Sequence, residues 1–412
     1  MTRSRRARAR RLAARAPTAQ RETLERRWFR RLSDAPQLAP LLTGEALARE
    51  PLHRWMAYPQ AFAPELVRLF LREAVSIPSL ADPAHLTTSH VPAPHSPSSL
   101  DDANDAGFVL DPFAGAGTTV IECARRGVRA IGVEALPSLA FLARCRGARA
   151  CPRFPDIRGR RTWREIAERV ETPIHRAALI LAVARQHASD GRPLRKPPEL
   201  RAALRAVLQE MRADLESPLP SEPDARQGDA RSLAGVADGA VAGVLTSPPY
   251  LSRHDYLRVA RPHEEVHAFW HGPAPPGARR QSQFAAHERA GARRIAESVP
   301  PAAEEAAQEL ESLGEPKLAG VTRSYFDDLR ACLCELRRVL RPAAPCWLVV
   351  GGARLKGALV PSDLILAEQA ESLGFTIEAA RVARRLTASG RRLGGLDDVA
   401  PRETLLALAA PR

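Results

Sequence analysis

Uninterrupted apolar runs alternate along this chain with segments whose apolar residues recur every three or four positions. The clearest runs are residues 108–110 and 241–245, and each leads directly into glycine- or proline-rich sequence. Short continuous runs predict buried strands, whereas the wider spacing predicts helices. The further predicted strands are 129–133, 346–350, 375–379 and 403–409, and the predicted helices are 119–126, 137–145, 325–340, 361–373 and one that begins at Pro64-Glu65.

This order of elements predicts an α/β fold, because a crossover helix must connect neighbouring parallel strands. Residues 108–145 have the strand–turn–helix pattern of a mononucleotide-binding unit. We therefore expect a mostly parallel, doubly wound sheet that is closed by an antiparallel C-terminal strand. Residues 150–215 are rich in Arg, Ala and Leu at helical spacing, so we expect two or three helices inserted there.

A glycine turn follows the first apolar run, in the string DPFAGAGT at residues 111–118. Glycine lets the backbone pass close to a ligand at Gly115 and Gly117, where a Cβ would clash. The dinucleotide pattern Gly-x-Gly-x-x-Gly is absent, since Val120 stands at its third position. The turn therefore favours a cofactor smaller than a dinucleotide, and S-adenosyl-L-methionine fits that size.

Three acidic residues follow predicted strands and could anchor such a cofactor. Asp111 ends the first strand, where it can accept a hydrogen bond from the α-amino group of a methionine moiety. Glu134 ends the second strand, the position from which an acid binds ribose hydroxyls in nucleotide-binding sheets. Asp229 lies near a third strand, where its carboxylate could reach the adenine amine.

The second run leads into the string TSPPY at residues 246–250. An exocyclic amine is a poor nucleophile because its lone pair is delocalised into the ring, so a site must orient it. The Ser247 hydroxyl or carbonyl and the Pro248 carbonyl can each accept one amine N–H, and Pro249 helps to stiffen the loop. The ring of Tyr250, rather than its hydroxyl, is expected to stack on a base that has left the helix.

The string VLDPFAGAGTTVIECARRGVRAIGVEALP resembles the cofactor motif of the amino-methyltransferases of DNA. In that family, the residue at Phe113 and the glycines line the cofactor pocket. The segment Tyr58-x-x-x-Phe62-x-Pro64 resembles the flanking motif that closes over the methionine end of the cofactor, and Asp255-Tyr256 resembles the residues that follow the base loop. The similarity covers residues 54–146 and 227–260, and more loosely residues 322–410.

The resemblance implies a Rossmann-like class I methyltransferase fold and a cytoplasmic enzyme that flips its target base out of double-stranded DNA. A Ser at the start of the tetrapeptide is more typical of the cytosine-N4 branch, which we prefer, whereas adenine-N6 methylation stays open. Such enzymes belong to DNA methylation and restriction-modification. RNA, including tRNA, remains an alternative substrate, and a DNA-binding protein that has lost catalysis is a further alternative.

Taken together, the motifs assign fourteen site residues. The expected cofactor-binding residues are Tyr58, Phe62, Asp111, Pro112, Phe113, Gly115, Gly117, Thr118, Glu134 and Asp229, and the expected catalytic residues are Ser247, Pro248, Pro249 and Tyr250. The expected segments are a basic N-terminal arm or helix (1–50), a cofactor-binding half (51–149), a helical insertion for target recognition (150–226), a base-binding half (227–261), a polar basic insertion (262–321) and the C-terminal part of the methyltransferase domain (322–412).

Composition favours nucleic acid as a partner and argues against a metal or a membrane. The net charge of +14 comes almost wholly from arginine, and residues 1–31 alone contain twelve arginines. A basic chain of this kind attracts nucleic acid phosphates. No apolar run reaches membrane-spanning length, and the six cysteines show no metal-binding spacing, so we expect free thiols, no metal and no membrane. Nothing in the pattern determines the oligomeric state.

Overall fold

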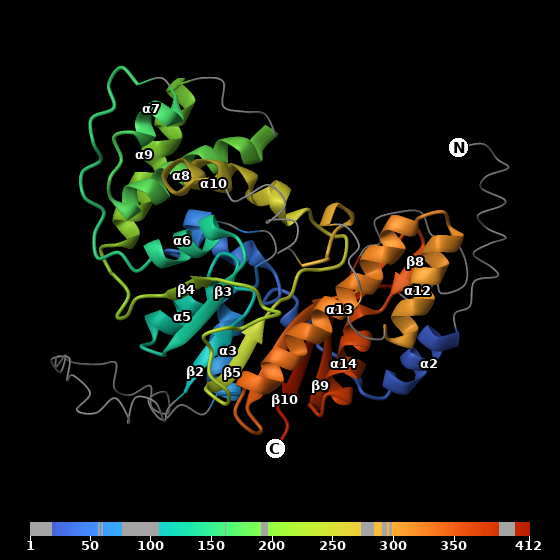
Figure 1. Cartoon of the computed structure of the whole chain (residues 1–412). Coiled ribbons are helices and arrows are strands. Elements are labelled where there is room, and N and C mark those ends of the chain that lie inside the picture. The colour runs from blue at the N-terminus through green and yellow to red at the C-terminus, as the bar shows by residue number, and fades with distance from the viewer. Residues whose placement is uncertain are drawn as a thin grey trace.

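A mixed sheet of eight strands forms the centre of the molecule (Figure 1). The computed structural model describes residues 19–56, 58, 61–75, 107–160, 162–190, 197–272, 284–290, 295, 299–386 and 400–412. The strand order is β1-β9-β10-β6-β5-β2-β3-β4. In chain order the strands are β1 (Leu32–Asp34), β2 (Phe108–Asp111), β3 (Ala130–Glu134), β4 (Asp224–Gln227), β5 (Val241–Thr246), β6 (Pro345–Gly351), β9 (Thr376–Arg385) and β10 (Arg402–Ala409).

Only β10 runs against its neighbours in this sheet. It pairs antiparallel with β6 and β9, whereas the other neighbouring strands pair in parallel. The predicted architecture, a mostly parallel, doubly wound Rossmann-like sheet with an antiparallel C-terminal strand, is confirmed. The parallel order also places the carboxyl ends of β2, β3 and β5 at one edge of the sheet, where ligands bind in such folds.

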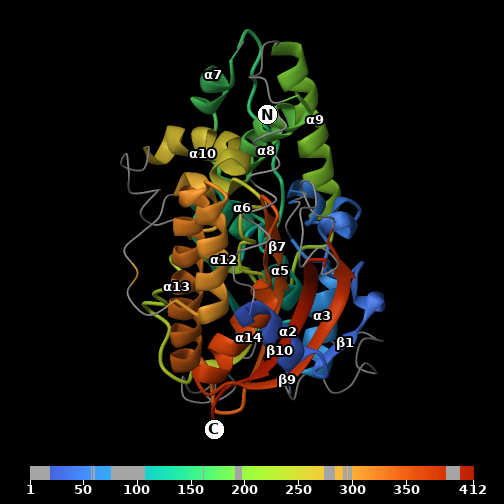
Figure 2. The same cartoon turned by 90° about the vertical axis from the view of Figure 1, so that its right-hand side faces the viewer.

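Helices cover both faces of the sheet, and a helical lobe stands above its carboxyl edge (Figures 1 and 2). Apolar residues of α2, α12, α13 and α14 pack on one face, while α3 and α5 pack on the other. The helices are α2 (Ala19–Trp28), α3 (Pro64–Glu73), α5 (Thr118–Arg125), α6 (Pro137–Cys145), α7 (Trp163–Ala167), α8 (Pro173–Asp190), α9 (Pro197–Asp214), α10 (Tyr256–His271), α12 (Pro301–Ser312), α13 (Pro316–Val339) and α14 (Ser362–Ser372). A hairpin of β7 (Ala353–Leu355) and β8 (Ala358–Val360) follows β6.

Two or three helices were expected in the insertion 150–226, and the lobe contains three from this range, α7, α8 and α9. Helix α10 packs against α8, and it adds buried residues such as Ala260 and Val266 to the same apolar cluster. Helix α10 crosses the expected division between residues 261 and 262, and β4 contains the expected division at 226/227. The lobe is therefore built from two segments that lie far apart in the sequence.

The N-terminal segment, expected to be a basic arm or helix, contains a helix in its described part. Residues 1–18 lie outside the described residues, but α2 packs against α12 and α14, and β1 adds a parallel edge strand beside β9. Arg21 is fully buried and forms ion pairs with Glu305 and Glu309. Residues 19–34 are thus part of the fold, because their apolar and charged side chains have partners in the C-terminal half.

The expected polar insertion 262–321 is also partly incorporated in the core. Its Ala-rich stretch forms α12, which buries Ala303, Ala306 and Leu310. In the described residues, no helix combines the length and apolar character that a membrane span requires.

Candidate active site

A cavity of about 800 Å³ opens at the carboxyl edge of the sheet. The glycine turn after β2, the end of β3, the segment after β4 and the loop after β5 all line it. Thirteen of the fourteen expected site residues line this cavity, and the exception is Gly117. Two motifs separated by more than a hundred residues therefore share one chamber, because β2 and β5 are neighbouring parallel strands.

Asp111 connects the two motifs directly. Its Oδ1 accepts hydrogen bonds from the Phe113 backbone N–H at 3.1 Å and from the Thr246 hydroxyl at 2.6 Å, and its Oδ2 accepts one from the Thr119 hydroxyl at 2.7 Å. Burial raises the pKa of this carboxyl from 3.8 to about 6, although the three hydrogen bonds oppose the rise. A buried carboxylate at the floor of the cavity favours a cationic ligand group such as an ammonium.

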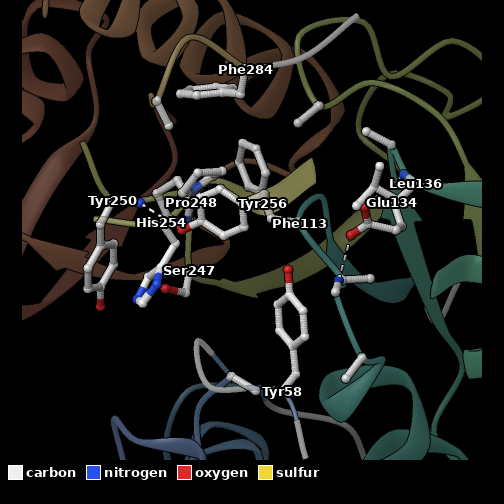
Figure 3. Close-up of a pocket in the computed structure, with 18 of the residues that line it drawn as sticks. Tyr58, Phe113, Glu134, Leu136, Ser247, Pro248, Tyr250, His254, Tyr256 and Phe284 are labelled. Atoms are coloured by element: carbon white, nitrogen blue, oxygen red, sulfur yellow. Dashed lines mark hydrogen bonds between the residues drawn. The ribbon is translucent and has the colours of Figure 1, made fainter. Parts of the chain in front are cut away.

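Glu134 ties the glycine turn to the end of β3. One carboxylate oxygen accepts the Gly115 N–H and the other accepts the Leu136 N–H, each at 2.8 Å (Figure 3). Burial raises the pKa of Glu134 to about 7, and the nearby charges of Asp111 and Glu264 add to the rise. Each carboxylate oxygen has a further lone pair, so Glu134 can also accept hydrogen bonds from a diol.

The two glycines of the turn have different roles. Gly115 has φ +51°, and a Cβ there would point into the cavity with no atom nearer than 3.9 Å, the closest including the Tyr58 ring. Gly117 has φ +85°, and a Cβ there would lie 2.7 Å from the Ala143 Cβ on α6. Gly115 thus keeps space free for a ligand, whereas Gly117 allows the turn to pack closely against α6.

Tyr58 lies across the cavity from the base loop, and Phe62 is a further lining residue (Figure 3). Both side chains are buried and line the cavity, and the Tyr58 hydroxyl points into the chamber toward the base loop (Figure 3). Asp229 also lines the cavity, but its carboxylate accepts hydrogen bonds from Arg231, which pairs with Asp328 as well. The Asp229 carboxylate, which was expected to reach the adenine amine, is therefore ion-paired with Arg231 in this structure.

Ser247 is arranged to accept a hydrogen bond in the cavity. Its hydroxyl donates to the Val349 carbonyl on β6 at 3.2 Å. Because a hydroxyl has one proton and two lone pairs, this contact leaves its oxygen able to accept from a substrate N–H. Pro248 and Pro249 also line the cavity and restrict the loop that carries Ser247.

Tyr250 is held at three places. Its hydroxyl donates to Glu403 on β10 at 3.0 Å, and its backbone N–H donates to the Tyr256 hydroxyl at 3.1 Å. The ring also passes so close to Gly351 that a Cβ there would lie 2.5 Å from it. Tyr250 is consequently a fixed part of the wall, and its hydroxyl has a structural role in addition to that of the ring.

Several lining residues were not identified from the sequence. Glu403 and Arg384 come from β10 and β9 and form an ion pair, while Glu264 of α10 accepts the Ser138 N–H at 2.8 Å. Phe284 packs edge-on against Phe113 with ring centroids 5.4 Å apart (Figure 3). Of these residues, only Glu403 had a sequence signal that could have identified it, because it is an acidic residue in a mainly apolar closing strand.

The cavity contains no arrangement typical of a metal centre. Within the described ranges, no three His, Cys, Asp or Glu side chains gather as metal ligands would. The six cysteines are free thiols, and five of them are buried or half-buried.

Comparison with known proteins gives only distant structural likenesses. No protein-family model matches the chain, and no curated protein matches it in sequence. The crystal structure of TrmN from Thermus thermophilus aligns with 88% of this chain at 16% identity and a TM-score of 0.30, and the chain spans about half (53%) of that protein. The rRNA methyltransferase aviRa from Streptomyces viridochromogenes aligns over 90% of this chain and 92% of its own, at 14% identity and a TM-score of 0.28.

Proposed function

We propose that this protein is an S-adenosylmethionine-dependent methyltransferase that acts on the exocyclic amine of an extruded base in DNA, with cytosine N4 preferred. The observation that carries the proposal is the single cavity shared by the glycine turn and the Ser-Pro-Pro-Tyr loop, joined through Asp111 and Thr246. A methyl donor and a flat base could meet there without any change of fold.

The residues of the turn fit the cofactor. The space above Gly115, the acceptor atoms of Glu134 and the buried charge of Asp111 suit an adenosyl group, a ribose diol and an ammonium respectively. When bound, S-adenosylmethionine supplies an electrophilic methyl group. Asp111 would hold the amino end of the methionine moiety, and Glu134 would hold the ribose, so both groups fix where the methyl lies.

The loop would orient the nucleophile. The Ser247 oxygen and the Pro248 carbonyl would each accept one N–H of the amine, which directs the nitrogen lone pair toward the methyl group. Holding both reactants in one geometry contributes to the rate because it avoids the entropic cost of their encounter. Tyr250 would bound the base on one side, with its ring fixed by Glu403 and Gly351.

Product analysis tests the proposal. The protein is incubated with labelled S-adenosylmethionine and either duplex DNA, tRNA or rRNA, and the digested nucleosides are separated by mass. N4-methylcytosine from DNA is the expected product, and Ser247→Ala provides the matched loss of activity. Only N6-methyladenine would refute the base assignment, methylation confined to RNA would refute the substrate class, and no methylation of any nucleic acid would refute the function.

A further inference from the structure

Three arginines stand at the mouth of the cavity without an acidic partner. Arg253, Arg258 and Arg261 line the cavity, and all three are exposed. No ion pair links any of them to an acid among the residues that the structure describes. The nearby Asp255 is already engaged, because it caps α10 and pairs with Arg289 at 3.2 Å.

Several other arginines of the fold have acidic partners. Arg231, Arg323 and Arg402, for example, each contact two acidic side chains of the fold itself. Arg253, Arg258 and Arg261 are distinguished by their place, because these three exposed cations without an ion pair all line the binding cavity. Such a cluster attracts an external anion, and guanidinium groups bind phosphate through two parallel hydrogen bonds.

The three arginines have a fixed position relative to the base loop. Arg258 and Arg261 lie three residues apart on α10, a spacing that places them on one face of the helix. The start of α10 is anchored to the base loop, because the Tyr256 hydroxyl accepts the Tyr250 N–H. Arg253 lies in the short connection between the two. A nucleotide that enters the cavity base first would leave its flanking phosphates at this rim.

We infer that Arg253, Arg258 and Arg261 bind the phosphodiester groups on either side of the extruded nucleotide, an inference that rests on the proposed function. The contact recognises phosphate and not a base, so it acts on every sequence alike. The ligand is a polynucleotide strand, and DNA and RNA share the phosphate chemistry that these residues would recognise.

Salt dependence of binding tests this inference. The single Arg→Ala variants and the triple variant are compared with the wild-type full chain on DNA and RNA strands of one sequence, across a range of salt concentrations. Each lost phosphate contact should reduce the slope of log affinity against log salt by about one. The triple variant should lose about two to three units of slope and bind every sequence more weakly.

Two controls separate a local effect from a general one. Arg337→Ala removes the same charge from an exposed position of α13, close to the start of β6 and hence at the edge of the sheet opposite the cavity. It should leave the slope unchanged. Calorimetry with S-adenosylmethionine should give wild-type affinity for all variants, which shows that the cavity is intact.

The outcomes distinguish this inference from the proposed function. A triple variant with wild-type slope on both DNA and RNA overturns the inference, and so does an equal loss in Arg337→Ala. A loss on DNA or on RNA supports it and identifies the strand that is bound. A wild-type protein that binds a strand through these arginines but methylates none would overturn the proposed function and leave the inference standing.

Discussion

Removing the buried charge of Asp111 should make the protein more stable and at the same time weaken cofactor binding. In Asp111→Asn, the amide oxygen can still accept from the Phe113 N–H and the Thr246 hydroxyl, and the amide NH₂ can donate to the Thr119 hydroxyl. The substitution therefore keeps the hydrogen bonds and the shape of the site while it removes the ionisable group.

The size and pH dependence of the effect follow from the pKa. Burial raises the pKa of Asp111 from 3.8 to about 6, so the ionised carboxylate opposes folding. Two pKa units correspond to about 3 kcal/mol of destabilisation in the free energy of unfolding. This destabilisation is complete above pH 6 and disappears below pH 4, where Asp111 is protonated in both the folded and the unfolded protein. For a chain of this size the variant should melt roughly 3–4 °C higher at pH 8.

Cofactor binding should change in the opposite direction. The amide cannot compensate the positive charge of an ammonium, and hydrogen bonds to charged groups contribute about 1.5–3 kcal/mol, so S-adenosylmethionine should bind roughly ten- to a hundredfold more weakly. In the wild type, affinity should rise as the pH passes upward through 6, because the ligand favours the ionised carboxylate. This pH dependence should be lost in the variant.

Scanning calorimetry of the ligand-free protein at pH 8 and pH 5, with isothermal titration of the cofactor, measures both effects. Asp34→Asn, at an exposed position of β1, is the matched control and should shift stability by no more than about 0.5 kcal/mol. A variant that melts below the wild type at pH 8 would refute the reasoning about the buried charge. Unchanged cofactor affinity would refute the placement of the amino group.

Three further predictions concern the same cavity. Gly115→Val should abolish S-adenosylmethionine binding in titration calorimetry while circular dichroism stays native. The valine side chain would occupy the space beside Tyr58, and the backbone φ at this position is unfavourable for valine. Binding at wild-type affinity would contradict the placement of the cofactor beside Gly115. Ser247→Ala should lower turnover about tenfold with cofactor affinity intact, measured by methyl incorporation, since one acceptor for the amine is lost. Tyr250→Phe and Glu403→Ala should each reduce activity roughly fivefold, and their combination should be no worse than either alone, because each removes one partner of the same 3.0 Å contact; fully additive losses would show that the contact does not position the ring.

The sequence predicted the elements around the cavity well. The helix expected at 137–145 is α6, Pro137–Cys145, and the strand expected at 241–245 is β5, Val241–Thr246. Buried parallel strands are continuously apolar, and proline at the first helical position marks where a helix begins. The same features placed each motif at the end of a predicted strand, and the structure shows that these two strands are neighbours.

The elements that escaped prediction lack such signals. Strand β4 has the sequence DARQ and pairs only with β3, so as an edge strand it needs little apolar surface. Helix α12 buries mainly alanines and itself contains four glutamates, so its sequence resembles that of a polar segment. The rim residues Arg384 and Phe284 reach the cavity only through the tertiary arrangement of segments distant from either motif.

Two arginines of the N-terminal segment show that basic residues there also stabilise the fold. Arg21 is buried between Glu305 and Glu309, and Arg27 pairs with Glu368 and Glu371, so these charges stabilise the fold and are not available to a nucleic acid. Removing residues 1–31 would therefore remove α2 and its buried ion pairs, which makes such a truncation unsuitable as a test of phosphate binding. Among the described residues, Arg253, Arg258 and Arg261 line the cavity without an ion pair, so the proposed phosphate contact is better tested at these three positions than at α2.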